Sequence, residues 1–234
     1  MLSMMSSSRK SGAAFLVGLL LTMQGFFVVT FLVANAPLEK TMGAVQKIFY
    51  FHVPCAWLLM LSTFACAGGS LAYLFRGSER GDRLALSSAE LGVLFGLCVM
   101  VTGPLWARAA WGVFWTWDVR LTSSLLLWLM LIAYGLARRY GGEGGRRLAA
   151  ALALFAAADV PLVYLSVNVW RGLHPNTKTV SSLDPGMRWP FFLSLAIFSA
   201  LWGVLLVLRM RVERTQARLV ELAITVEDAE GRSP

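Results

Sequence analysis

Six apolar stretches, each long enough to cross a lipid bilayer as a helix, dominate the sequence. They run over residues 13–34, 51–75, 84–106, 121–137, 148–167 and 189–208. About 20 residues, rising 1.5 Å each, cross the hydrocarbon core of a membrane. Only 15% of the residues are charged, whereas a soluble domain has about 25%. We therefore predict an all-α integral membrane protein with six transmembrane helices.

Lysine and arginine predict how these helices are oriented. The N-terminal tail, the second and fourth loops and the C-terminal tail carry twice as many of them as the other three loops. Basic residues concentrate on the cytoplasmic side of membrane proteins. We expect residues 1–12 and 209–234 to be cytoplasmic tails and residues 13–208 to form the transmembrane domain. The net charge of +8 then indicates membrane topology and not a nucleic-acid partner.

The first apolar stretch also resembles a secretory signal peptide. Arg9 and Lys10 precede it, and "ANA" at residues 34–36 resembles a cleavage site. The apolar run is 22 residues long, whereas that of a signal peptide has about 7–15. We expect a retained helix, and the orientation of the rest of the chain is the same either way.

The sequence contains only two histidines, and this topology places both at the outer end of the bundle. His52 lies in "KIFYFHVPCAW" and His174 in "NVWRGLHPNTK". Either one alone could be an interfacial histidine, since an imidazole suits the headgroup region. Together on one side, they favour a shared ligand. The three cysteines form no CxxC or CxxCH motif, so a bound haem would not be attached covalently in the usual c-type manner.

Tryptophan is also concentrated at the predicted outer end. An ordinary aromatic belt decorates both interfaces. Here seven of the nine tryptophans lie at the outer end: Trp57, Trp106, Trp111, Trp115, Trp117, Trp170 and Trp189. In the stretch "AAWGVFWTWDVRLTS", Trp111, Trp115 and Asp118 have the spacing of one helix face. We therefore predict a short interfacial helix in the loop at residues 107–121.

Haem is the ligand that these features favour. Two neutral imidazoles can bind iron from opposite faces, and indole rings can pack on the porphyrin and exclude water. Propionates need cations, and five are candidates: Lys47, Arg120, Arg171, Lys178 and Arg188. A quinone or a lipid would leave the histidine pair unexplained, and zinc would need further protein ligands.

The whole chain resembles the haem-handling proteins of cytochrome c maturation that share a tryptophan-rich "WWD" loop. It is most similar to the haem exporter protein C family, through "FHVP" at the second span, "WGVFWTWDVRLTS" between the third and fourth, and "LHP" between the fifth and sixth. The chain departs from the family pattern at Phe114, Val119 and Lys47, where the family commonly has tryptophan, proline and arginine. These changes imply altered packing and the loss of bidentate arginine geometry at Lys47.

The resemblance implies a role for each matching residue. His52 and His174 would be the axial ligands of a non-covalently bound b-type haem. The haem-presenting loop would consist of Trp111, Trp115, Trp117, Asp118 and Arg120. The protein would not be an enzyme.

The resemblance also implies a location and partners. The protein would lie in the bacterial inner membrane with its functional loops on the periplasmic side. It would deliver haem to a membrane-anchored haem chaperone, the E protein of the maturation system. It would work with the ABC-type subunits A and B and with a small single-helix protein, the D protein of the same system. Two other functions stay open at this point: a b-type cytochrome acting as a quinol oxidoreductase, and a permease component that binds no haem.

Overall fold

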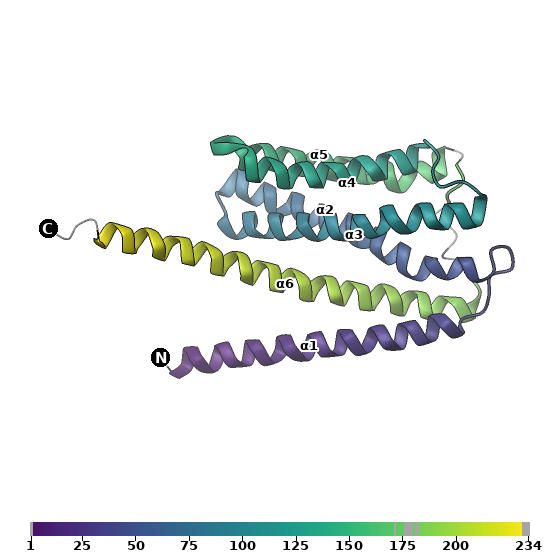
Figure 1. The fold of residues 1–234 in the computed structure, drawn as a ribbon, viewed down its shortest axis with the longest axis horizontal. Coiled ribbons are helices and arrows are strands. Elements are labelled where there is room, and N and C mark those ends of the chain that lie inside the picture. Colours follow the sequence, from purple (N-terminus) through teal and green to yellow (C-terminus); the bar gives the residue numbers. More distant parts are fainter. Residues whose placement is uncertain (1, 171, 176–179, 181–182, 231–234) are drawn as a thin grey trace.

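The computed structural model describes residues 2–170, 172–175, 180 and 183–230, which form six long helices (Figure 1). All six contain a segment that is long and apolar enough to span a membrane, as the sequence predicts. The helices are α1 (Leu2–Asn35), α2 (Phe49–Arg76), α3 (Glu79–Trp111), α4 (Val119–Tyr140), α5 (Gly145–Val169) and α6 (Pro185–Glu230). Two short 3₁₀ helices, η1 (Ala44–Ile48) and η2 (Gly142–Gly144), precede α2 and α5.

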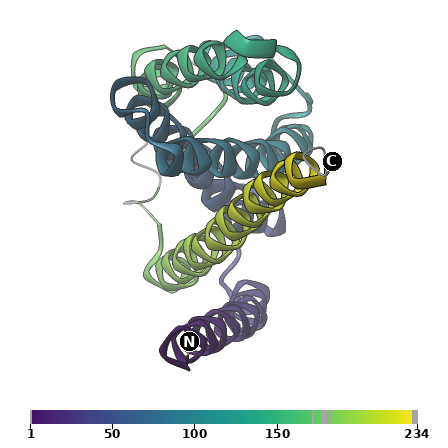
Figure 2. The same ribbon diagram turned by 90° about the vertical axis from the view of Figure 1, so that its left-hand side faces the viewer.

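Helices α2 to α5 form a compact group, and α6 packs across α2 and α3 (Figures 1 and 2). Helix α1 lies on the far side of α6 and packs mainly against it (Figure 2). The core of the four-helix group contains fully buried Leu127, Leu131 and Tyr134 from α4 and small residues such as Ala149 and Ala153 from α5. Small residues at helix contacts let backbones approach closely, which is how helices associate within a membrane.

The tightest approach is between α2 and α3. A Cβ atom on Gly69 would lie 2.5 Å from the carbonyl oxygen of Gly81, so the backbones of the two helices touch there. Gly77 ends α2 in the left-handed conformation, with φ 58°, where glycine pays no steric penalty. Ser78 then begins α3 as its N-cap, because its side chain accepts a hydrogen bond from the amide of Gly81. This tight turn places α3 antiparallel to α2, so the start of α2 and the end of α3 lie at the same end of the bundle.

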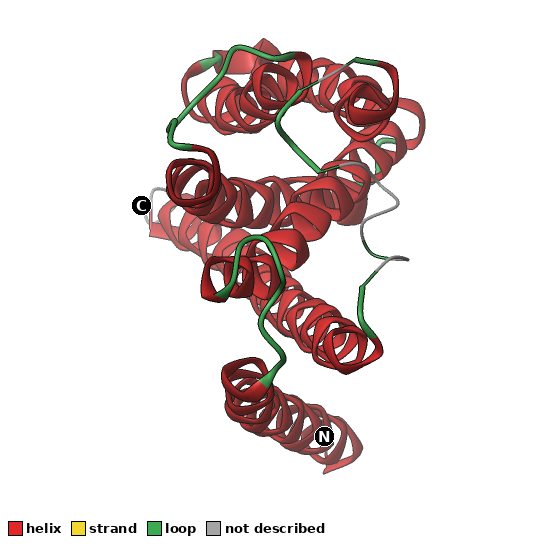
Figure 3. Cartoon of the chain, turned by 90° about the vertical axis from the view of Figure 1, so that its right-hand side faces the viewer, coloured by secondary structure: helices red, strands yellow, loops and turns green. Residues whose placement is uncertain are grey.

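Both described chain ends lie at the same end of the bundle, and the connections that precede α2, α4 and α6 lie at the other (Figures 1 and 3). We call these the terminal end and the loop end. The loop end carries both histidines and the tryptophan-rich loop. The assignment of the loop end to the periplasm stays a prediction.

Helix α6 is longer than a membrane crossing requires. Its 46 residues exceed the roughly 20 that cross the hydrocarbon core, and the helix continues without a break past residue 208. Arg209 joins it to α3 through two hydrogen bonds to the Glu90 carboxylate, and Arg209 also pairs with Glu213 at 2.7 Å.

The prediction of a short interfacial helix in the tryptophan-rich loop is wrong. Helix α3 continues to Trp111 and ends at Gly112, which has φ 78°. The segment from Gly112 to Asp118 is irregular, and α4 begins at Val119 with Asp118 as its N-cap. The left-handed glycine and the capping aspartate, which accepts a hydrogen bond from the amide of Leu121 at 2.9 Å, override the helical spacing of the aromatic residues.

Candidate functional site

His52 lies in the first turn of α2, and its side chain is buried. Its Nδ1 atom is 2.8 Å from the hydroxyl oxygen of Thr102 on α3. That hydroxyl donates its own hydrogen to the carbonyl of Cys98, so it can only accept from the imidazole. Nδ1 of His52 therefore carries the hydrogen, and Nε2 keeps a free lone pair.

His174 lies in the connection between α5 and α6. It has the same tautomer as His52, but a different acceptor selects it. Its Nδ1 atom is 2.8 Å from the carbonyl oxygen of Pro175. Because a carbonyl oxygen can only accept, Nδ1 must be the protonated nitrogen and Nε2 is free. Burial, followed by the nearby positive charge of Arg120, lowers the pKa of His174 from 6.5 to about 4. The imidazole is therefore neutral at physiological pH.

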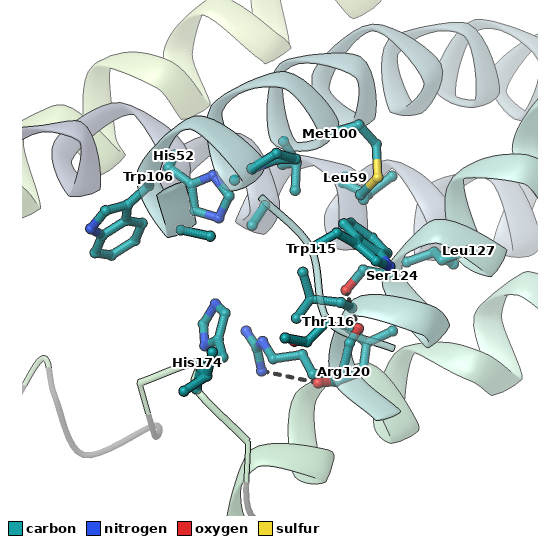
Figure 4. Close-up of a pocket in the computed structure, with 18 of the residues that line it drawn as sticks. His52, Leu59, Met100, Trp106, Trp115, Thr116, Arg120, Ser124, Leu127 and His174 are labelled. Carbon is teal, nitrogen blue, oxygen red and sulfur yellow. Dashed lines mark hydrogen bonds between the residues drawn. The ribbon is translucent and has the colours of Figure 1, made fainter. Parts of the chain in front are cut away.

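The two imidazoles point toward one another across an open space (Figure 4). We call this space the histidine cavity, and it has two adjoining lobes that share His52, Trp106, Arg120 and His174 as lining residues. The lobe that reaches Trp115 has a volume of about 70 Å³. The lobe that reaches Trp57 has a volume of about 340 Å³. Two imidazole nitrogens with free lone pairs thus face one cavity from different parts of the fold.

Aromatic rings wall the cavity on both sides of the histidine pair (Figure 4). Trp106, which is buried, lies edge-on to the His52 ring with ring centres 5.7 Å apart. Trp111 stacks on Trp106 at 6.2 Å and also lines the cavity. Trp115 lines the opposite side. Deeper in the bundle the lining is apolar, with Leu59, Met60, Met100 and Leu127.

Among the described residues, Arg120 is the only cationic side chain that lines the cavity. It lies in the first turn of α4, beside His174 (Figure 4), and donates a 3.0 Å hydrogen bond to the carbonyl of Val163 on α5. This bond occupies one of its five N–H donors, which leaves others for an anionic group. A guanidinium in this position suits a carboxylate.

The remaining loop residues predicted for the site lie outside the cavity lining. Trp117 is 78% exposed and packs its edge against Trp115 at 5.8 Å. Asp118 caps α4 and accepts a 2.9 Å hydrogen bond from the hydroxyl of Thr116, which does line the cavity. Asp118 therefore fixes the loop around the cavity, and Trp117 faces outward.

Two of the five cations predicted to meet propionates are engaged elsewhere. Lys47 donates to the carbonyl of Ala34, and the Nε of Arg188 donates to the carbonyl of Leu183. Neither lines the cavity. Arg171 and Lys178 lie outside the described residues, so Arg120 is the predicted cation that the structure places at the site.

The structure adds three site residues that the sequence prediction omits. Trp106 lies within α3, against His52, and not in the aromatic loop. Thr102, one turn earlier, orients the His52 ring. Gly103 supplies space for that ring, since a Cβ atom there would lie 3.3 Å from Cε1 of His52. Their spacing along one face of α3 is visible in the sequence, but their distance from His52 along the chain conceals the contact.

This set of groups fits a flat, apolar ligand that carries an iron atom and carboxylates. The two free Nε2 atoms can bind iron, the indoles can pack against a porphyrin, and Arg120 can meet a propionate. Within the described part of the chain, no group of three or more His, Cys, Asp or Glu side chains is placed to hold a metal ion. A bare structural zinc ion, which takes four protein ligands, would lack a complete set here.

Comparisons with known proteins identify the family of this chain. The family described as "Heme exporter protein C" matches residues 3–225. A protein of that name from Bradyrhizobium diazoefficiens is 34% identical over 195 residues, which cover 81% of this chain and 74% of the relative. The Escherichia coli K12 protein of the same name is 32% identical over 75% of this chain and 73% of its own. A ccmC-like mitochondrial protein of cytochrome c biosynthesis from Arabidopsis thaliana is 31% identical over 90% of this chain and 81% of its own.

Proposed function

The chain belongs to the haem exporter protein C family, and on this premise we propose that it binds haem at its loop end and delivers it during c-type cytochrome biogenesis. His52 and His174 are the axial ligands, each through Nε2. The observation that carries this proposal is the shared tautomer, because both lone pairs face the same cavity (Figure 4). A hydrogen bond on the other ring nitrogen is the usual arrangement for a metal-binding histidine.

The protein groups around the iron hold the haem without covalent attachment. Trp106 and Trp115 pack against the porphyrin and keep water from the iron, and Arg120 binds one propionate. Asp118 fixes the loop beside the cavity through its hydrogen bonds to Thr116 and to the first turn of α4. The bound group is haem b, and the protein carries out no reaction on it.

Delivery needs one haem edge to stay accessible to an acceptor. Aromatic residues at the loop end are exposed, among them Trp117 and Phe114, and they suit docking of a partner that takes the haem. This partner is the membrane-anchored haem chaperone, the E protein of the maturation system. The ABC-type subunits A and B and the single-helix D protein complete the assembly, and the loop end faces the periplasm.

A transfer experiment tests this function against the two alternatives. The purified protein is loaded with haem, and its visible spectrum is followed before and after addition of the apo-chaperone. The proposal expects a Soret band that moves to the chaperone. A permease without haem gives no Soret band, and a quinol oxidoreductase gives a haem that quinol reduces and the chaperone does not remove.

A further inference from the structure

A second hollow lies at the terminal end of the bundle, between α3 and α4, and shares no lining residue with the histidine cavity. It has a volume of about 720 Å³. Its walls are largely apolar, with Leu86 and Val93 from α3 and Ile132 and Leu136 from α4. We call it the α3–α4 groove. Nothing in the proposed haem function uses it.

The groove is closed toward the middle of the bundle and open on its outer face at Gly135. Toward the middle of the bundle, the Nε1–H of Trp128 donates to the carbonyl of Val93 at 3.0 Å, and Trp128 packs where Gly96 has no side chain. The two helices therefore touch at this point and end the groove. Nearer the terminal end, Gly135 lines the groove and is exposed, and no atom lies within 4 Å of where its Cβ would be. This missing side chain leaves the groove open toward the surrounding lipid.

Three arginines surround the mouth of the groove: Arg138, Arg139 and Arg146. Arg138 binds Asp82 through two hydrogen bonds, one of 2.8 Å, and Arg146 pairs with Glu79 at 3.1 Å. Arg139 packs over the ring of its neighbour Tyr140 and forms no ion pair with any described residue.

The acid that lines the groove does not offset this charge. Glu90 is bound by Arg209 of α6 through two hydrogen bonds. The arginines Arg138, Arg139 and Arg146 thus outnumber their acidic partners Asp82 and Glu79 by one positive charge. This excess lies where the apolar groove meets the end of the membrane-spanning region.

We propose that the α3–α4 groove binds one anionic phospholipid. The phosphodiester is held by Arg139, with Arg146 beside it, and one acyl chain lies in the apolar groove over Gly135. Basic pockets between transmembrane helices are typical sites for acidic lipid headgroups. A protein helix is about 10–12 Å across, so a groove of this volume would hold only about one and a half turns of it. An acyl chain is thinner and is already present in the membrane.

Native mass spectrometry of the full-length protein in detergent tests the proposal. Phosphatidylglycerol and phosphatidylethanolamine with the same acyl chains are added in turn, and the bound lipid is counted. The wild type is expected to retain one phosphatidylglycerol more strongly than phosphatidylethanolamine. Arg139→Gln should lower phosphatidylglycerol retention about tenfold, the effect of losing one charge-assisted hydrogen bond, and Gly135→Leu should lower it by filling the groove.

Two matched variants control for general effects. Gly68→Leu adds the same side chain at another exposed helical glycine with open space around it, and Arg76→Gln removes an exposed arginine outside the groove. Both should retain phosphatidylglycerol as the wild type does. Equal retention of the two lipids, unchanged retention in both groove variants, or a co-purified polypeptide that displaces the lipid would overturn the proposal. The result is independent of haem binding, which a visible spectrum of the same samples reports.

Discussion

His52 and His174 face one cavity from two different parts of the chain, and each uses its Nδ1 hydrogen on a neighbouring oxygen. The two oxygen atoms are chemically different, a threonine hydroxyl and a proline carbonyl, but they select the same tautomer. Both rings therefore offer Nε2 to the same space. This shared selection is what makes the pair suited to bind one iron atom, and it can be tested without altering either histidine.

Thr102→Val removes the acceptor that orients the His52 ring and keeps the volume of the side chain nearly constant. Loss of such a partner typically lowers metal affinity about 10- to 100-fold. We expect haem affinity, measured by titration of the Soret band, to fall within this range while the helical content is unchanged. Thr22→Val is the matched control, because Thr22 on α1 also bonds to a carbonyl of its own helix but lies away from the cavity. Equal effects of the two substitutions would count against the role of Thr102.

Trp115 and Trp117 should differ in what they do, although they are two residues apart. Trp115 lines the cavity, and Trp117 is 78% exposed. We expect Trp115→Ala to weaken haem retention on a desalting column. Trp117→Ala should retain haem normally but pass it more slowly to the apo-chaperone. If Trp117→Ala lost haem as readily as Trp115→Ala, the outward placement of Trp117 would have no functional meaning.

The pKa of His174 predicts how the haem-free protein responds to acid. In the folded protein this pKa is lowered to about 4 by burial and by Arg120, whereas it is about 6.5 in an unfolded chain. Between these values the unfolded state binds more protons, so the free energy of unfolding falls as the pH drops from about 6.5 to about 4. The thermal midpoint of the wild type should therefore fall relative to that of His174→Asn on acidification. A constant difference between the two midpoints from pH 7 to pH 4 would contradict this.

The number and approximate limits of the membrane helices could be predicted from the sequence because apolar length alone specifies them. The residues that surround the site could be predicted only in part. Spacing favours Trp111, Trp115 and Asp118 on one helix face, but Gly112 and the capping role of Asp118 are local backbone effects that stop the helix. Thr102 and Trp106 could not be predicted as site residues, because they contact His52 from another helix. Local spacing in the sequence does not show contacts between helices.

The ion pair between Asp82 and Arg138 should matter more for stability than for haem. Both side chains are largely buried, with exposures of 5% and 13%. Asp82→Asn leaves Arg138 without its carboxylate, and breaking a buried pair in this way costs about 3–5 kcal/mol. Glu79→Gln breaks only the exposed pair with Arg146, which should cost at most about 1 kcal/mol. Thermal unfolding monitored by circular dichroism should separate the two variants, and equal midpoints would show that the buried pair contributes little.

Visible and electron paramagnetic resonance spectra of the haem-loaded protein test the central claim, that one iron atom is bound between His52 and His174, most directly. The wild type should give the six-coordinate, low-spin spectrum of an iron with two imidazole ligands. His52→Ala and His174→Ala should each give a high-spin spectrum, and the double variant should lose the haem on purification. A low-spin spectrum that persists unchanged in either single variant, or normal haem content in the double variant, would contradict the assignment.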